Sequence, residues 1–270
     1  MANLNWIWSL SQEALPSDWV AEGHAAPIDW LHWTGTLVYA VIFVGLAWRV
    51  VRAFQRQARY QAKDLLSDAD LEELKLEIVA AESRTVGEIL PVVVERSDAH
   101  PKALWLSSLV FVILGSTFVS GELPIDQPVI VLVAQLCMGL FGYCLAYYLP
   151  DFARLFVSES RASEMAQEQA FQEFYRHGLH KTEAQTGVLI FVSLFEHRVV
   201  VLADEGINAK VSEDQWQETD LAILGEIAKG SLKQGLSAGI LSAAGVLEEH
   251  FPWVDGDRNE IPDRIIVRRE

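Results

Sequence analysis

The sequence predicts the α/β fold class, with three transmembrane helices plus a cytoplasmic α/β sandwich that has a small mixed sheet. The first supporting observation is composition: 51% of the 270 residues are hydrophobic while 21% are charged, and the mean hydropathy is +0.18. The second is segregation, because long uncharged runs separate segments that have the helix and strand patterns of a soluble domain. Such segregation is typical of membrane helices joined to a polar domain.

Three apolar runs have the length that a helix needs to cross a bilayer. The first run predicts a transmembrane helix at 33–52, and the other two, at 103–119 and 129–149, predict a membrane hairpin. None of the runs carries a charge before its rim, and aromatic side chains such as Trp48 and Trp105 lie where the membrane interfaces fall. These runs together predict an integral membrane protein.

The distribution of lysine and arginine predicts which way the spans run. No basic residue precedes Arg49, and the loop between the second and third spans carries Glu122 and Asp126 without a base. Basic residues follow the first span directly and form a basic collar: Arg49, Arg52, Arg56, Arg59 and Lys63. Because basic loops stay on the cytoplasmic side, we expect the N-terminus outside and the C-terminal domain inside. We therefore predict a protein of the bacterial inner (cytoplasmic) membrane.

The formal net charge of −16 argues against a nucleic-acid partner, because a nucleic-acid-binding protein needs a basic face for the phosphates. The negative charge falls mainly on the inner segments, which an anionic inner leaflet repels while the basic collar holds to it. The expected partners are therefore the lipid bilayer and the subunits of a membrane protein complex, with no nucleic acid.

The first part of the soluble domain follows the basic collar. Ser67 is a typical N-cap, and the acids after it suit the N-terminus of a helix that is expected to reach Glu82. The run at 89–95 predicts a strand, in which Pro91 favours an edge or strand-start position. The apolar stripe of the helix consists of Leu71, Leu74, Ile78 and Val79.

The second part of the soluble domain follows the membrane hairpin. A long polar helix is expected at 152–177, with Phe171 among its buried candidates and Gly178 as its stop. The sequence GVLIFVSLFEHRVVVLAD then predicts two strands, at 187–194 and 198–203, around a tight turn.

Two more helices and a tail complete the chain. Ser212 and Gln215 form a capping box for a helix that ends at Gly230. A last helix is expected at 232–249. The residues after it show little periodicity and are expected to form a tail.

The two soluble parts are expected to form one domain across the membrane hairpin, because neither part alone has enough strands to cover its helices. The strand at 89–95 should therefore share a sheet with the strand at 187–194. The predicted segments are an outer tryptophan-rich arm at 1–32, transmembrane helix 1 at 33–52, the collar and first domain part at 53–102, the membrane hairpin at 103–149, the second domain part at 150–252 and a C-terminal tail at 253–270.

Four motifs in the soluble parts carry a resemblance to a known family. They are AESRTVGEI at 81–89, TGVLIFVSL at 186–194, RVVVLADEGI at 198–207 and GLSAGI at 235–240. In this order and spacing they resemble the TPM-domain family, also called the TPM phosphatase family, over residues 66–95 and 152–252. Its members include thylakoid-lumen proteins linked to photosystem repair, an animal receptor accessory protein and bacterial membrane proteins without an assigned role. The resemblance therefore implies a TPM-like fold rather than one function.

The thylakoid members are described as acid phosphatases with metal-binding acids, and such domains often carry Asp-Asn-Gly immediately before the central strand. Here residues 184–187 read Ala-Gln-Thr-Gly, so the Gly is kept but one potential metal oxygen is lost. Asp204, Glu205 and Glu88 remain as candidate ligands for Ca²⁺ or Mg²⁺. Alternatively these acids cap turns and face water, and the protein has no cofactor.

A second candidate metal site lies at the end of the long polar helix. Glu173, His177 and His180 form a metal site if all three face one way. However, Gly178 breaks the helix between the two histidines, so a hydrogen bond at the helix end is the alternative role.

Partner contacts are expected from residues in or beside the membrane. Gln135 is polar within the third span, so it should face another helix, either inside the hairpin or in a partner subunit. Trp6, Trp8 and Trp19 of the outer arm are candidates for partner binding, with a short interfacial helix as the alternative.

Two functions are compatible with these features. The leading hypothesis is an accessory, assembly or stabilising subunit of a larger membrane protein complex, which by family analogy includes an electron-transfer or photosynthetic complex. The alternative is a membrane-bound, metal-dependent acid phosphatase. No Cys, Ser or His elbow supports nucleophilic catalysis, and a transporter normally needs polar groups at mid-membrane.

Overall fold

The computed structural model describes residues 41, 44–45, 48–52, 65–122 and 127–268. The predicted outer arm at 1–32 and most of the predicted transmembrane helix at 33–52 lie outside the described residues, as does the basic collar beyond Arg52. The elements named below all lie within Leu46–Glu270.

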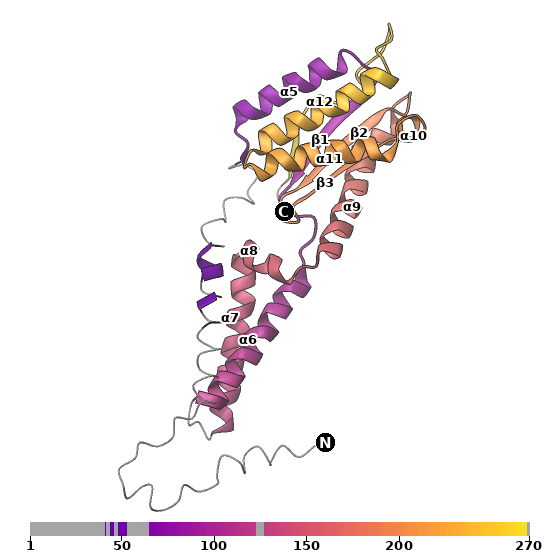
Figure 1. The fold of residues 1–270 in the computed structure, drawn as a ribbon. Helices are drawn as coiled ribbons and strands as arrows, with labels where there is room; N and C mark the ends of the chain where they lie inside the picture. Colours follow the sequence, from indigo (N-terminus) through magenta and orange to yellow (C-terminus); the bar gives the residue numbers. More distant parts are fainter. Residues whose placement is uncertain (1–40, 42–43, 46–47, 53–64, 123–126, 269–270) are drawn as a thin grey trace, which may run out of the picture. The chain divides into compact units, whose positions relative to one another are not determined.

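A small mixed sheet forms the centre of the soluble domain (Figure 1). Its strands are β1 Glu88–Val94, β2 Gly187–Ser193, β3 Arg198–Ala203 and β4 Ile266–Arg268, in the order β3-β2-β1-β4. β1 pairs in parallel with both β2 and β4, whereas β2 and β3 are antiparallel. The predicted pairing between the strands on either side of the hairpin is confirmed, and it joins the two soluble parts.

The two central strands are buried along their whole length, which explains why their sequences, EILPVVV and GVLIFVS, are apolar except for Glu88 and Ser193 at one end of each. Side chains alternate along a strand, so Ile89 and Val188 face one hydrophobic core while Leu90 and Leu189 face the other. The sheet is therefore covered on both faces, as an α/β sandwich requires.

Three helices cover one face of the sheet and a fourth covers the other (Figure 1). The first face carries α5 Asp68–Glu82, α11 Glu213–Ala228 and α12 Leu232–His250, and the second carries α9 Glu159–Arg176. The predicted N-cap Ser67 begins α5, where it forms a capping box with Asp70, and the predicted capping box at Ser212 begins α11. α12 lies between α5 and α11, and it approaches α11 closely because a Cβ on Gly239 would lie 2.6 Å from Ile223 Cδ1.

Pro91 lies in a central strand, so the predicted edge position is wrong for the strand as a whole. The N–H of Glu88 points toward β2, where it donates to Thr186 O at 3.1 Å, so the nitrogens of Ile89 and Pro91 face the β4 side. Pairing with β4 begins only at Val92. Pro91 therefore removes no ladder hydrogen bond from the sheet.

The C-terminal tail is not structureless, because it supplies the fourth strand. Thr85 forms an antiparallel bridge with Pro252, and its Oγ1 donates to Phe251 O at 2.6 Å, which directs the tail along the first domain part. β4 then pairs with residues 92–94 of β1. A strand of three residues has almost no periodicity of its own, which is why the sequence does not reveal it.

The long polar helix predicted at 152–177 is divided. A short helix α8, Pro150–Ala153, is followed by the 3₁₀ turn η2, Arg154–Phe156. Ser158 then begins α9 as an N-cap that accepts from Arg161 N at 3.3 Å. Gly178 follows α9 in the left-handed conformation, as its predicted role as a helix stop requires.

Two side chains that were expected in the core lie on the surface. Val79 of α5 is 42% exposed, and Phe171 of α9 is 53% exposed. The buried stripe of α5 consists of Leu74, Ile78 and Ala81. The helix is thus rotated about its axis so that Val79 faces outward.

The two predicted hairpin spans are helices, α6 Pro101–Glu122 and α7 Pro128–Tyr148. They pack closely, because Ser107 Oγ donates to Gly142 O at 2.7 Å and a Cβ on Gly142 would lie 2.7 Å from Phe111. Among the described residues, these two helices are long and apolar enough to cross a membrane by length and composition. The third predicted span lies largely outside those residues and stays a prediction.

Replacing Gly187 with Ala should destabilise the domain, because the added Cβ would lie 2.5 Å from Leu179 O. Overpacking of this kind costs about 1–3 kcal/mol. Gly225→Ala is the matched control: a Cβ there meets nothing within 4 Å, so it should stabilise α11 by roughly 0.5–1 kcal/mol. Thermal melting of the detergent-solubilised protein measures both changes, and equal melting temperatures for the two variants would contradict this packing.

Candidate functional site

Two of the three acids predicted as metal ligands lie in one row across the sheet. Glu88 is the first residue of β1, and Asp204 directly follows the last residue of β3. Glu88 pairs with Gly187, and Asp204 N donates to Gly187 O at 2.9 Å. Side chains directly across a sheet point to the same face, so Glu88 and Asp204 both face the α9 side. Leu179 O fills the space at Gly187, which separates the two acids.

Glu88 is buried, and both of its carboxylate oxygens accept backbone hydrogen bonds. Oε1 accepts from Glu260 N at 2.9 Å, and Oε2 accepts from Ile261 N at 3.3 Å. Burial raises the pKa of Glu88; the two amide bonds oppose this shift, and the charges of Glu260 and Asp263 add to it. The Glu88 carboxylate therefore holds the C-terminal segment against β1.

Glu82, from the same motif as Glu88, lies at the end of α5. Its Oε1 accepts from Ile89 N at 2.8 Å, on the side of β1 that β4 leaves unpaired. Burial is the main cause that raises the pKa of Glu82 to about 9, and Asp263 and Glu88 contribute. Glu82 is therefore protonated at neutral pH, which allows these acids to lie close together.

Asp204 is the N-cap of a short helix, α10 Glu205–Asn208, that directly follows β3. One Asp204 oxygen accepts from Glu205 N at 2.8 Å, and Oδ2 is buried without a hydrogen-bond partner among the described residues. Gly206 packs on the 184–187 loop, since a Cβ there would lie 2.7 Å from Gln185 O. The loop that replaces Asp-Asn-Gly thus lies against the Asp204 turn.

The three predicted ligands are not gathered around one point. Glu205 is exposed, while Glu88 and Asp204 are buried on either side of Gly187. Across the described part of the chain, there is no group of three or more His, Cys, Asp or Glu side chains that could hold a metal ion. A Ca²⁺ or Mg²⁺ site at these residues stays a prediction.

Glu173, the centre of the second candidate metal site, is fully buried and saturated by donors. Its carboxylate is 2.8 Å from Arg176 Nη1 and 3.0 Å from His177 Nε2, and it also binds Arg268 of β4. The ring of His180 instead lies 4.8 Å from that of Tyr175. Glu173 therefore ties α9 to β4, because its buried carboxylate is paired with two partly exposed arginines.

The sequence does not reveal a buried polar network at the opposite end of the sheet. His100 Nε2 lies 2.6 Å from Glu196 Oε1, and Ser97 N donates to both Glu196 oxygens at 3.1 Å. Burial by itself would raise the pKa of Glu196, but bonds from His100, Ser193 and Ser97 lower it overall. His100 O also accepts from Ala103 N at 2.9 Å. The network thus connects the β2–β3 turn to the start of α6. The only hint of it in the sequence is the run of polar residues between β1 and α6.

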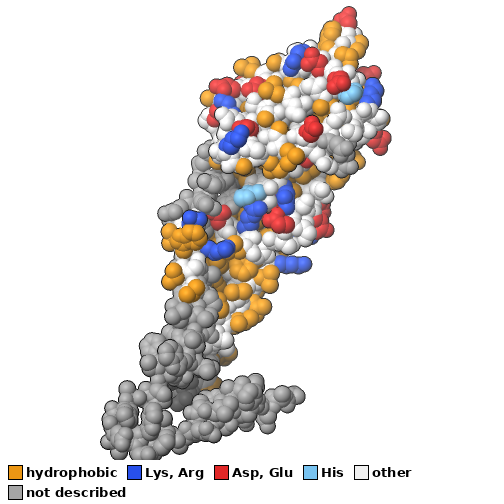
Figure 2. Space-filling view, in the orientation of Figure 1, with side chains coloured by type: hydrophobic (Ala, Val, Ile, Leu, Met, Phe, Trp, Pro, Cys, Tyr) orange, Lys and Arg blue, Asp and Glu red, His pale blue; other side chains and the backbone are white. Residues whose placement is uncertain are grey.

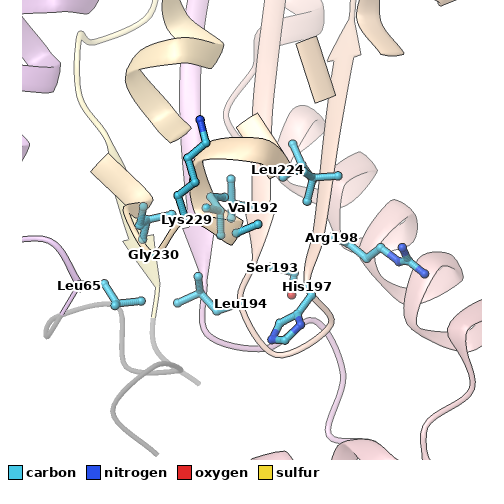
Figure 3. Close-up of a pocket in the computed structure, with 13 residues that line it drawn as sticks. Leu65, Val192, Ser193, Leu194, His197, Arg198, Leu224, Lys229 and Gly230 are labelled. Atoms are coloured by element: carbon cyan, nitrogen blue, oxygen red, sulfur yellow. The ribbon is translucent and has the colours of Figure 1, made fainter. Parts of the chain in front are cut away.

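A cavity of about 460 Å³ lies beside the β2–β3 turn, between the sheet and the end of α11 (Figure 3). Its wall is mainly apolar and includes Val192, Leu194, Val199, Leu224 and Ile227. Basic residues at its edge are engaged elsewhere, since Arg198 binds Glu159 of α9 and Lys229 Nζ lies 2.6 Å from Glu226. None of the predicted site residues lines this cavity.

The predicted partner-binding residues fall into two groups. Gln135 Nε2 donates to Ser116 Oγ at 3.0 Å, so within the described residues it joins α7 to α6. This is the first of the two roles expected for it. Trp6, Trp8 and Trp19 lie outside the described residues, and their role in partner binding stays a prediction.

Comparison with known proteins identifies the domain. Residues 152–246 match the family model described as the TPM domain (TPM_phosphatase). The chain therefore contains a TPM domain, which confirms the resemblance carried by the sequence motifs. The first soluble part lies outside the matched residues, although its strand β1 belongs to the same sheet.

The chain is also similar to a solved NMR structure, that of the BA42 protein from the psychrophilic bacterium Bizionia argentinensis sp. nov. The two are 23% identical with a TM-score of 0.49, over 76% of this chain and 97% of that chain. No curated protein matches the sequence.

Replacing Glu82 with Gln should flatten the pH dependence of stability. The pKa of Glu82 is about 9 in the fold against an ordinary 4.5, so the folded state keeps a proton that the unfolded state loses. Stability should therefore fall as the pH rises from about 4.5 to about 9. Glu82→Gln mimics the protonated form, so it should melt higher than the natural protein at pH 8.

Glu72→Gln is the matched control, because Glu72 is an exposed acid on the same helix. Melting temperatures between pH 5 and pH 9 (about the window of the shift) test the assignment. A Glu82→Gln protein that loses stability with pH as steeply as the Glu72→Gln protein would show that Glu82 is not the titrating group.

Proposed function

We propose that this chain is a membrane-anchored TPM-domain protein that acts as an accessory, assembly or stabilising subunit of a larger membrane protein complex. The observation that carries the proposal is the direct continuity between the domain and the apolar hairpin. β1 ends at Val94, α6 begins at Pro101, and α7 leads through α8 back to α9. The hairpin is therefore an insertion in the soluble α/β domain, between β1 and β2, rather than an appendage at one end of it.

The surface of the hairpin supports an anchoring role. Large apolar side chains are exposed along both helices: Leu109, Ile113, Leu132, Leu136, Leu140 and Phe141. Exposed apolar surface of this extent is stable against lipid or another membrane protein and costly in water. The hairpin satisfies its own polar groups, because Gln135 and Ser116 bond to each other. Two helices and the basic collar then fix the TPM domain at one membrane surface.

The chemistry of the acidic edge favours a structural over a catalytic role. Both oxygens of Glu88 are occupied by amides of the C-terminal segment, and Glu82 is protonated. The 184–187 loop supplies no carboxylate to the edge where Asp204 lies. These groups are therefore used to close the fold.

A membrane-bound, metal-dependent acid phosphatase is the second candidate. One observation favours it: Asp204 Oδ2 is buried without a partner on the same edge as Glu88. A hard cation such as Ca²⁺ or Mg²⁺ prefers such oxygen ligands. If this candidate holds, the purified full-length chain hydrolyses a generic phosphomonoester with Ca²⁺ or Mg²⁺, and Asp204→Asn abolishes the turnover.

The proposed membrane orientation can be tested with single cysteines in a chain whose Cys137 and Cys144 are replaced by Ala. A cysteine at Ser11 should react with an impermeant thiol reagent in intact cells, because the basic collar holds the opposite side in the cytoplasm. A cysteine at Ser237 of α12 should react only after the membrane is permeabilised. The reverse labelling pattern would place the TPM domain outside.

Replacing Trp6, Trp8 and Trp19 together with Ala should release the protein from its complex during gentle purification. Tryptophan is over-represented among interface anchors, and each lost anchor weakens binding by about 2 kcal/mol or more. Native gel migration of the membrane extract measures the association, and the melting temperature of the TPM domain should not change.

Trp253→Ala is the matched control, because Trp253 is an exposed tryptophan of the soluble domain. It should leave migration unchanged. Complete retention of the triple variant in the larger assembly would exclude the outer arm as an anchor. Rapid metal-dependent phosphatase turnover by the natural protein would replace the accessory role with the catalytic one.

A further inference from the structure

The helical layer on one face of the sheet holds most of the net charge of the chain. The helices α5, α11 and α12 together contain thirteen Asp and Glu residues and two Lys residues, a formal net charge of −11 out of −16 for the chain, and the protonated Glu82 makes the charge of the layer one unit less negative. The helix on the opposite face, α9, contains four acids and two bases. The formal negative charge is therefore concentrated in the helices on one face of the sheet. Figure 2 shows acidic side chains among basic and hydrophobic ones on the visible surface of the soluble domain.

Large apolar side chains project from the same three helices. Leu76 of α5 is 65% exposed, Leu241 of α12 is 56% exposed and Leu221 of α11 is 69% exposed, and Val79 of α5 joins them. A single exposed leucine is ordinary, whereas one from each of three adjacent helices requires an explanation.

Contacts between the helices place these side chains at one level. Thr219 Oγ1 lies 2.7 Å from Ser242 Oγ, which aligns Leu221 of α11 with Leu241 of α12. Lys233 binds Asp70 at one end of α12, and Arg84 binds Glu248 at the other. α5 and α12 therefore run parallel.

Leu76 and Val79 lie about halfway along α5 between those two ion pairs, and Leu241 lies about halfway along α12 between the same pairs. The three side chains are therefore at the same level. Because α12 lies between α5 and α11, the exposed side chains form an apolar row across the layer, with acids on both sides of it. We call the row of Leu76, Val79, Leu241 and Leu221 the three-helix surface.

We propose that the three-helix surface binds a basic amphipathic segment of a partner protein. The apolar row receives the apolar side of the segment, and the surrounding carboxylates pair with its Lys and Arg side chains. This inference rests on the proposed accessory role and names the chemistry of the partner.

Charge decides between the possible occupants. A second copy of this chain would bring a second acidic layer against the first, and like charges facing each other disfavour such a contact. An anionic lipid surface is repelled for the same reason. A segment with apolar residues at helical spacing and basic residues beside them complements both features of the surface.

The test uses the full-length protein in nanodiscs of zwitterionic lipid and a fluorescent 18-residue peptide of Leu and Lys with its leucines on one helical face (about five turns). The peptide should bind with a Kd that increases as salt is added, because the ion pairs are screened. Changing Leu76, Leu221 and Leu241 to Gln together should weaken binding by about tenfold or more, as loss of central apolar anchors does. Empty nanodiscs supply the background signal.

Two matched controls isolate the surface. Phe171→Gln removes an exposed aromatic ring from α9 on the opposite face and should leave the Kd unchanged. A peptide of the same composition with its leucines dispersed around the helix should bind at least about tenfold more weakly, because it has no apolar side.

Three results would overturn the inference. The first is equal binding of the two peptides, and the second is a loss of peptide affinity with Phe171→Gln as large as that with the three Leu→Gln changes. The third is a dimer of the natural protein that the three Leu→Gln changes dissociate. Failure of the inference is separable from failure of the accessory role. If peptide binding is absent while the chain still migrates with a larger assembly in native gels, the accessory role stands and only this surface is rejected.

Discussion

Seven residues of β1 pair in parallel with seven residues of β2, although the two helices of the hairpin lie between them in the sequence. Parallel strands need a long crossover, and here that crossover includes α6, α7 and α9. Both ends of the hairpin must therefore return to one sheet. Because of this pairing, anchoring the hairpin in a membrane also anchors the TPM domain.

Buried carboxylates hold the segments around these paired strands in place through hydrogen bonds and ion pairs. Glu88 holds the C-terminal segment at the start of β1, and Glu173 binds Arg268 of β4 on the α9 side. At the other end, Glu196 receives bonds from His100 and Ser97, next to the start of α6. A buried carboxylate without partners is costly, so each one fixes the position of the donors around it. Glu88 and Glu173, which the sequence suggests as metal ligands, thus stabilise the fold.

The molecule presents two surfaces of opposite character that together suit an accessory subunit. The hairpin exposes apolar side chains with few charges, whereas the layer of α5, α11 and α12 is strongly acidic with one apolar row. The first surface suits lipid or membrane helices, and the second suits a basic segment in the aqueous phase. The cavity beside the β2–β3 turn lies between the sheet and the end of α11, and its edge bases are paired with acids of the same chain.

The sequence by itself determined the elements whose signals are local: the apolar hairpin helices, the N-cap at Ser67, the capping box at Ser212, the β2 and β3 strands and the motifs of the TPM domain. These follow from periodicity and from residues close in the chain. Only the tertiary structure decided the rest. β4 is three residues long and exists because β1 pairs with it, Glu88 finds its donors in the distant C-terminal segment, and Val79 faces outward because α12 takes the other side of α5. Such contacts depend on which elements meet in space, and no local pattern contains that information.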